Sequence, residues 1–206
     1  MLPKRQASCM MTPEIRAFEF ALGLFSVLIG LAIADIATSF HRLMRARPRV
    51  RWDALVLLST LFAVVITVGM WFDLWGIRNA TSVRHFLVYL ALIGTFFVLF
   101  LIAASSLPDD AIEGADLGEF YEGNRRYFWS LVALFEIIYV AFGIHFLAGV
   151  FDRMPPGAVA IVISHWVVLV AVPIVLALVR SRVIHYAGLA LLFCIVLWHY
   201  AGTVIT

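Results

Sequence analysis

The chain has 206 residues, of which 64% are hydrophobic and 14% are charged. Soluble globular domains average about 45–50% apolar and about 25% charged residues, so this composition, with a mean hydropathy of +1.01, excludes a soluble fold and makes membrane lipid the expected surroundings. The 15 basic and 13 acidic side chains nearly cancel, which argues against nucleic acid as a partner.

Six apolar stretches are each long enough to cross a bilayer, which takes about 20 helical residues for roughly 30 Å of hydrocarbon. They are continuous rather than alternating, which favours helices over the strands of a membrane barrel. We therefore predict an all-α polytopic membrane protein, a six-transmembrane-helix bundle at residues 17–206 that follows an N-terminal tail at residues 1–16. The predicted helices cover residues 17–40, 54–76, 83–105, 128–151, 157–180 and 183–205.

The arginines beside these helices predict the orientation. One side of the membrane receives nine basic residues, including five between residues 42 and 51, and the other receives six. The positive-inside rule places the nine in the cytoplasm, so both termini are expected to be extracytoplasmic in a plasma or bacterial inner membrane. Translation from Met11 rather than Met1 would strengthen this bias. Tyr127, Phe128 and Trp129 are interpreted as anchors at headgroup depth.

Two features of the chain leave alternatives open. The stretch 105–126 is rich in acidic residues and reads as a solvated connector, or as a docking segment that contains a short interfacial helix. The dipeptide Phe18-Glu19 also has a counterpart in Phe135-Glu136, which raises the possibility of a 3+3 inverted repeat, an arrangement found in many transporters.

The first predicted helix carries a stripe of small residues headed by an acid. At 100° per residue, Glu19, Gly23, Ser26, Gly30 and Ala34 share one face. Such a stripe lets another backbone approach closely, so we interpret the four small residues as a helix-packing seam. The alternative is a narrow path with Glu19 at its outer mouth.

Acidic residues inside predicted helices are candidates for ion or proton sites. Charged groups are costly in hydrocarbon, so those present within a membrane span typically have a functional role. Glu136 lies deep in the fourth helix, and Tyr139 shares its face at a spacing of three residues. Asp73 and Asp35 lie nearer the ends of their helices. We therefore name Glu19, Asp35, Asp73, Glu136 and Tyr139 as transport or proton-relay candidates.

Three histidines fall at similar depth in the last three helices. Imidazoles at His145, His165 and His199 could together hold haem iron or a divalent metal, or relay protons. His145 and His165 are joined by a short loop and are the expected two-ligand core. The alternative is that each imidazole is hydrogen-bonded separately.

The sequence thus leaves three classes of function open. The first is translocation of an ion, a proton or a small solute, and the second is a haem- or metal-binding electron-transfer subunit. The third is a non-catalytic membrane partner that assembles with itself or with another membrane protein. The chain has no phosphate loop, nucleophile elbow or paired-cysteine zinc pattern, which disfavours an enzyme.

Overall fold

The structure, a computed structural model, describes residues 13–76, 86–109 and 115–201. These residues form six long helices and one short 3-10 helix, and each long helix is apolar and long enough to cross a membrane, which confirms the predicted bundle. The elements are α1 (Pro13–Arg45), η1 (Arg47–Arg49), α2 (Ala54–Gly76), α3 (Phe86–Ser105), α4 (Leu117–Phe151), α5 (Pro156–Leu178) and α6 (Arg182–Tyr200).

The fourth helix begins earlier than its hydropathy predicts. The side chain of Asp116 accepts hydrogen bonds from the backbone N–H groups of Gly118 and Glu119, which caps the first turn of α4. An aspartate at this position satisfies N–H groups that have no partner inside the helix. The prediction of an acidic connector over residues 105–126 is therefore wrong in its second half, which is the first part of α4.

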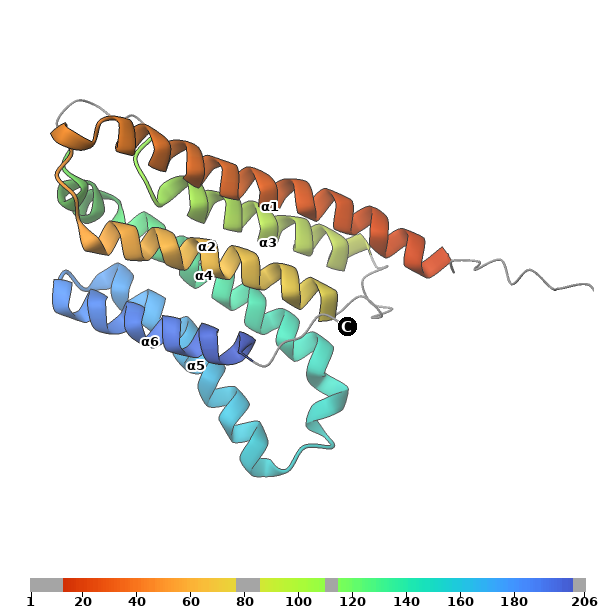
Figure 1. The fold of residues 1–206 in the computed structure, drawn as a ribbon. Coiled ribbons are helices and arrows are strands. Elements are labelled where there is room, and N and C mark those ends of the chain that lie inside the picture. The colour runs from red at the N-terminus through yellow and green to blue at the C-terminus, as the bar shows by residue number, and fades with distance from the viewer. Residues whose placement is uncertain (1–12, 77–85, 110–114, 202–206) are drawn as a thin grey trace, which may run out of the picture.

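The helices pack around α2, the most buried of the six spans (Figure 1). Helix α1 lies along α3, α3 packs on α4, and α4 packs on α5. Helix α2 contacts α1, α3, α4 and α6, and α6 also packs on α5. The α4–α5 hairpin extends away from the other helices at its tip, as Figure 1 shows.

The packing gives no support to a repeat of three helices. In a 3+3 repeat the contact between α1 and α3 would have an equivalent between α4 and α6. The first pair is extensively packed in the described residues, whereas the second pair makes at most marginal contact. The side chain of Glu19, one of the residues that suggested the repeat, lies outside the described part of the chain.

One end of the bundle holds η1, the α3–α4 connection and the α5–α6 connection, and we call it the arginine-rich end (Figure 1). Arg51 pairs with Asp116 through a short bridge of parallel backbone and through a salt bridge of 2.9 Å. Arg182, at the start of α6, forms a salt bridge with Asp53 just before α2. The end of the acidic stretch is thus bound to the basic loop rather than only solvated.

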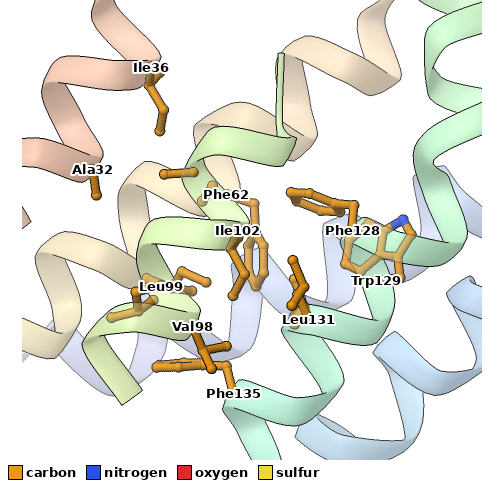
Figure 2. Close-up of a cluster of buried hydrophobic side chains, with 14 of the residues drawn as sticks. Ala32, Ile36, Phe62, Val98, Leu99, Ile102, Phe128, Trp129, Leu131 and Phe135 are labelled. Carbon is orange, nitrogen blue, oxygen red and sulfur yellow. The ribbon is translucent and has the colours of Figure 1, made fainter. Parts of the chain in front are cut away.

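A compact apolar core fills the middle of the bundle between α1, α2, α3 and α4 (Figure 2). Phe62 of α2 and Trp129 of α4 are completely buried, and their ring centroids lie 6.3 Å apart. Phe128 is buried beside them, so the prediction that Phe128 and Trp129 anchor the protein at headgroup depth is wrong. Tyr127, by contrast, is exposed, as an interfacial anchor would be.

Candidate functional site

A small cavity lies among α2, α4, α5 and α6, at the end of the bundle opposite the arginine-rich end. Each of these helices contributes at least one polar group to its lining, and apolar residues of the same helices complete it. The polar lining residues are Asp73 from α2, Glu136 and Tyr139 from α4, His165 from α5, and His199 and Tyr200 from α6. The structure therefore brings together five of the predicted candidates, namely Asp73, Glu136, Tyr139, His165 and His199.

Helical spacing explains why these side chains reach one cavity. Glu136 and Tyr139 are three residues apart on α4, so both point from the same face. On α6, His199 follows the buried Val196 at the same spacing, and Val196 also lines the cavity. These polar residues thus point into the bundle, on the same helix faces as buried apolar residues one turn away.

Glu136 is the most enclosed acid in the cavity, with 3% of the residue exposed. Among the described residues, its carboxyl group has no hydrogen-bond or ion-pair partner, although it lines the cavity and lies within electrostatic range of Asp73. A charged carboxylate without a partner is strongly unfavourable in a nonpolar interior. A proton or another cation therefore has to accompany the Glu136 carboxyl.

Asp73, in contrast, is held by two residues of α6. The Tyr200 hydroxyl donates a hydrogen bond of 2.6 Å to Oδ2, and Nε2 of His199 lies 3.6 Å from Oδ1. The His199 side chain is 43% exposed, so it connects the cavity to the surroundings. Gly69 lies one turn before Asp73, and because it has no side chain the Tyr200 ring can pack against it.

The histidines converge only in part. The ring centroids of His165 and His199 lie 6.2 Å apart at the cavity. His145 is exposed near the tip of the α4–α5 hairpin, where its ring contacts Phe146 of the same helix. The expected two-ligand core of His145 and His165 is therefore wrong, because the face of α4 that carries His145 points away from the cavity.

The cavity does not fit the haem hypothesis. It leaves about 30 Å³ for water-sized molecules, which admits a few waters and is far too little for a porphyrin. In the described ranges, no group of three or more His, Cys, Asp or Glu residues is arranged to hold a metal ion.

The remaining candidates lie elsewhere. Asp35, on α1, lies within electrostatic range of Arg42 and Asp109, near the arginine-rich end. It does not line the cavity. Glu19 belongs to the first turns of α1, but its side chain is outside the described residues.

Among the described residues, nothing packs closely on the predicted seam of α1. The structure leaves Gly23, Gly30 and Ala34 exposed and Ser26 half-buried, and a Cβ atom added at either glycine would meet nothing within 4 Å. The face of α1 that packs on the bundle is instead the one that carries Phe25.

A second polar cluster, which the sequence analysis did not identify, lies at the arginine-rich end. Nε2 of the buried His185 is 2.9 Å from the Val179 carbonyl, and Nδ1 is 2.5 Å from the Tyr121 hydroxyl. Because a carbonyl only accepts, Nε2 carries the hydrogen and Nδ1 accepts from Tyr121 in the neutral ring. Trp129 then donates to the Tyr121 oxygen, so every polar group in this chain of hydrogen bonds has a partner.

Arg125 completes this cluster and is also buried. Its guanidinium donates to the carbonyl oxygens of Ala177 and Val179, which lie at the C-terminal end of α5 and lack partners within the helix. The contact places a positive charge where the helix dipole is negative. No local sequence pattern marks this cluster, because Arg125 and His185 meet at the Val179 carbonyl from different helices.

An apolar layer separates the two polar clusters. His185 and His199 are 14 residues apart on α6, or about 21 Å at 1.5 Å per residue. Between them, Leu189 and Leu192 are buried, and they belong to the same apolar cluster as the buried Phe62 of α2 and Val132 of α4. The cavity is therefore closed towards the arginine-rich end by packed hydrocarbon side chains.

The fold defines this chain as a multi-pass integral membrane protein. Comparison with protein-family models, curated proteins and solved structures finds no match. Its molecular function is therefore argued from the geometry of the cavity.

Proposed function

We propose that this protein moves a small cation across the membrane and that Glu136 is the group that binds it. The observation that carries the proposal is the burial of the Glu136 carboxyl on a cavity without any partner among the described residues. A structural glutamate would gain stability from a hydrogen bond, because an unsatisfied buried polar group costs about 1–3 kcal/mol. Intramembrane acids that face a cavity are characteristic of ion and proton pathways.

The neighbouring groups support a route from Glu136 to one side of the membrane. Asp73 and the partly exposed His199 follow Glu136 towards the end of the bundle opposite the arginine-rich end. The distribution of arginines favours a cytoplasmic arginine-rich end, so this route would open to the extracytoplasmic side.

The apolar layer favours a carrier over an open channel. Packed side chains of α2, α4 and α6 close the cavity on its other side, so a cation bound at Glu136 has no continuous path across. Transport then requires a change in helix packing that exposes Glu136 to the two sides in turn.

The test is cation flux into proteoliposomes under an imposed membrane potential, with proton entry followed by an internal dye and sodium entry by radiotracer. We expect flux of one cation in the wild type and its loss in Glu136→Gln. Glu119→Gln is the matched control, because Glu119 is an exposed acid at the start of the same helix. A correctly folded wild type that moves neither cation would refute the proposal.

The unpacked face of α1 supports a second candidate function, assembly with a membrane partner. Small residues on an exposed helix face suit close helix–helix contact in lipid. Disulfide cross-linking of Gly30→Cys in membranes would give a dimer with a second copy if that face self-associates. The absence of a cross-linked dimer would refute self-association through this face.

A further inference from the structure

We propose that the transported cation is the proton and that it passes between Glu136 and Asp73 through water in the cavity. This inference rests on the function proposed above and names its substrate. It concerns two carboxyl groups on different helices, one enclosed and without a partner, the other held by α6 close to the surface.

The volume of the cavity limits what can occupy it. The cavity leaves about 30 Å³ for water-sized molecules, which admits a few waters and not a bulky organic solute. A few waters are enough to join two carboxyl groups that line the same small space. The size of the cavity is thus suited to a proton carried on water.

The chemistry of the lining leads to the same cation. Ca²⁺ and Mg²⁺ take six or more oxygen ligands. Here both oxygens of Asp73 face groups of α6, Tyr200 on one side and His199 on the other. Tyr139 and Tyr200 offer hydroxyls, and His165 and His199 offer imidazoles, all of which can both donate and accept a hydrogen. This lining can pass protons, and of its two carboxyl groups only that of Glu136 has no partner among the described residues and is left to bind a metal.

The transfer step conserves charge. The O–H bond of a protonated Glu136 breaks and its proton passes to a cavity water, while a proton from the water chain forms an O–H bond on the Asp73 carboxylate. The pair carries one negative charge before and after the step. Asp73 then releases its proton through His199, whose imidazole is suited to proton exchange near neutral pH. The Tyr200 hydrogen bond occupies Oδ2, so Oδ1, which faces His199, is the atom that receives the proton.

The experiment compares proton and sodium flux in proteoliposomes for wild type, Glu136→Gln, Asp73→Asn and the control Glu119→Gln. We expect dye-reported proton entry at the same rate in sodium, potassium or N-methylglucamine buffer. This rate should fall by about 100-fold in Glu136→Gln and in Asp73→Asn, at the lower end of the contribution of positioned acid–base groups. Sodium entry that depends on Glu136 would overturn the proton assignment and leave the proposed function standing.

Other outcomes separate the remaining steps. The absence of flux of either cation would remove the proposed function and this inference together. Wild-type proton flux in Asp73→Asn would overturn the passage through Asp73. If Glu136→Gln fails to fold, infrared spectra of the wild type can distinguish a proton from sodium at Glu136. The absorption band of its protonated carboxyl group should change with pH and stay unchanged when sodium is added. A sodium-induced loss of that band would refute the proposal.

Discussion

Gly69→Ala tests whether the Tyr200 ring and Asp73 form one unit at the mouth of the cavity. A Cβ atom at position 69 would lie 2.6 Å from Cζ and 2.7 Å from the hydroxyl oxygen of Tyr200. An ordinary contact needs about 3.5 Å, so the end of the phenol ring has to move by about 1 Å. The hydrogen bond of 2.6 Å to Asp73 would then lengthen to about 3.6 Å, which is no longer a hydrogen bond.

The expected cost follows from two opposing effects. Loss of a hydrogen bond to a charged acceptor costs roughly 1.5–3 kcal/mol, whereas replacing glycine by alanine within a helix gains up to about 1 kcal/mol. Gly69→Ala should therefore destabilise the protein by about 0.5–2 kcal/mol. Gly94→Ala is the matched control, because its added Cβ would meet nothing within 4 Å, and it should be neutral or slightly stabilising.

The assay is unfolding by sodium dodecyl sulfate in mixed micelles, carried out as a double-mutant cycle with Tyr200→Phe. If Gly69→Ala acts by breaking the hydrogen bond, it should cost about 1.5 kcal/mol less when the hydroxyl is already absent. Additive costs, or a Gly69→Ala protein as stable as Gly94→Ala, would refute the reasoning.

Three further predictions concern the arginine-rich end and the orientation. Arg125→Met removes the donor to two carbonyls at the end of α5 and should lower the unfolding free energy by about 2 kcal/mol in the same assay; an unchanged value would mean that water replaces the guanidinium. His185→Phe should cost about 1–3 kcal/mol because it removes an acceptor and a donor from a buried chain of hydrogen bonds. His145→Phe, at an exposed position, should stay within about 0.5 kcal/mol of the wild type, and equal effects at the two histidines would contradict the network. In a cysteine-free background, an impermeant thiol reagent added to intact cells should label Arg153→Cys and not Arg47→Cys; the opposite pattern would invert the proposed orientation.

The class of protein and the positions of its spans followed from the sequence, because insertion into a membrane is a local property. A helix satisfies its own backbone hydrogen bonds and needs only about 20 apolar residues to span the bilayer, so each span could be recognised without its neighbours. Polar residues stand out in such spans for the same reason. Glu136, Asp73, His165 and His199 were all identified before their surroundings were known.

The rotation of each helix about its axis was decided only by the tertiary structure. In a soluble protein the apolar face of a helix marks the core, but in lipid apolar residues face both the bundle and the bilayer. The sequence therefore could not tell that His145 faces outwards while His165 faces the cavity, or that Gly30 lies on the unpacked side of α1.

Contacts between distant segments were equally beyond the sequence. Trp129 resembles an interfacial anchor in its local context, yet it is fully buried because α2 packs against its face of α4. Tyr121 and His185 are 64 residues apart and meet only because α4 and α6 enclose the same space at the arginine-rich end. Hydropathy determined which segments enter the membrane, because the energy of inserting a helix depends on its own composition. Side-chain packing determined which polar groups meet there, because the energy of a contact depends on two helices at once.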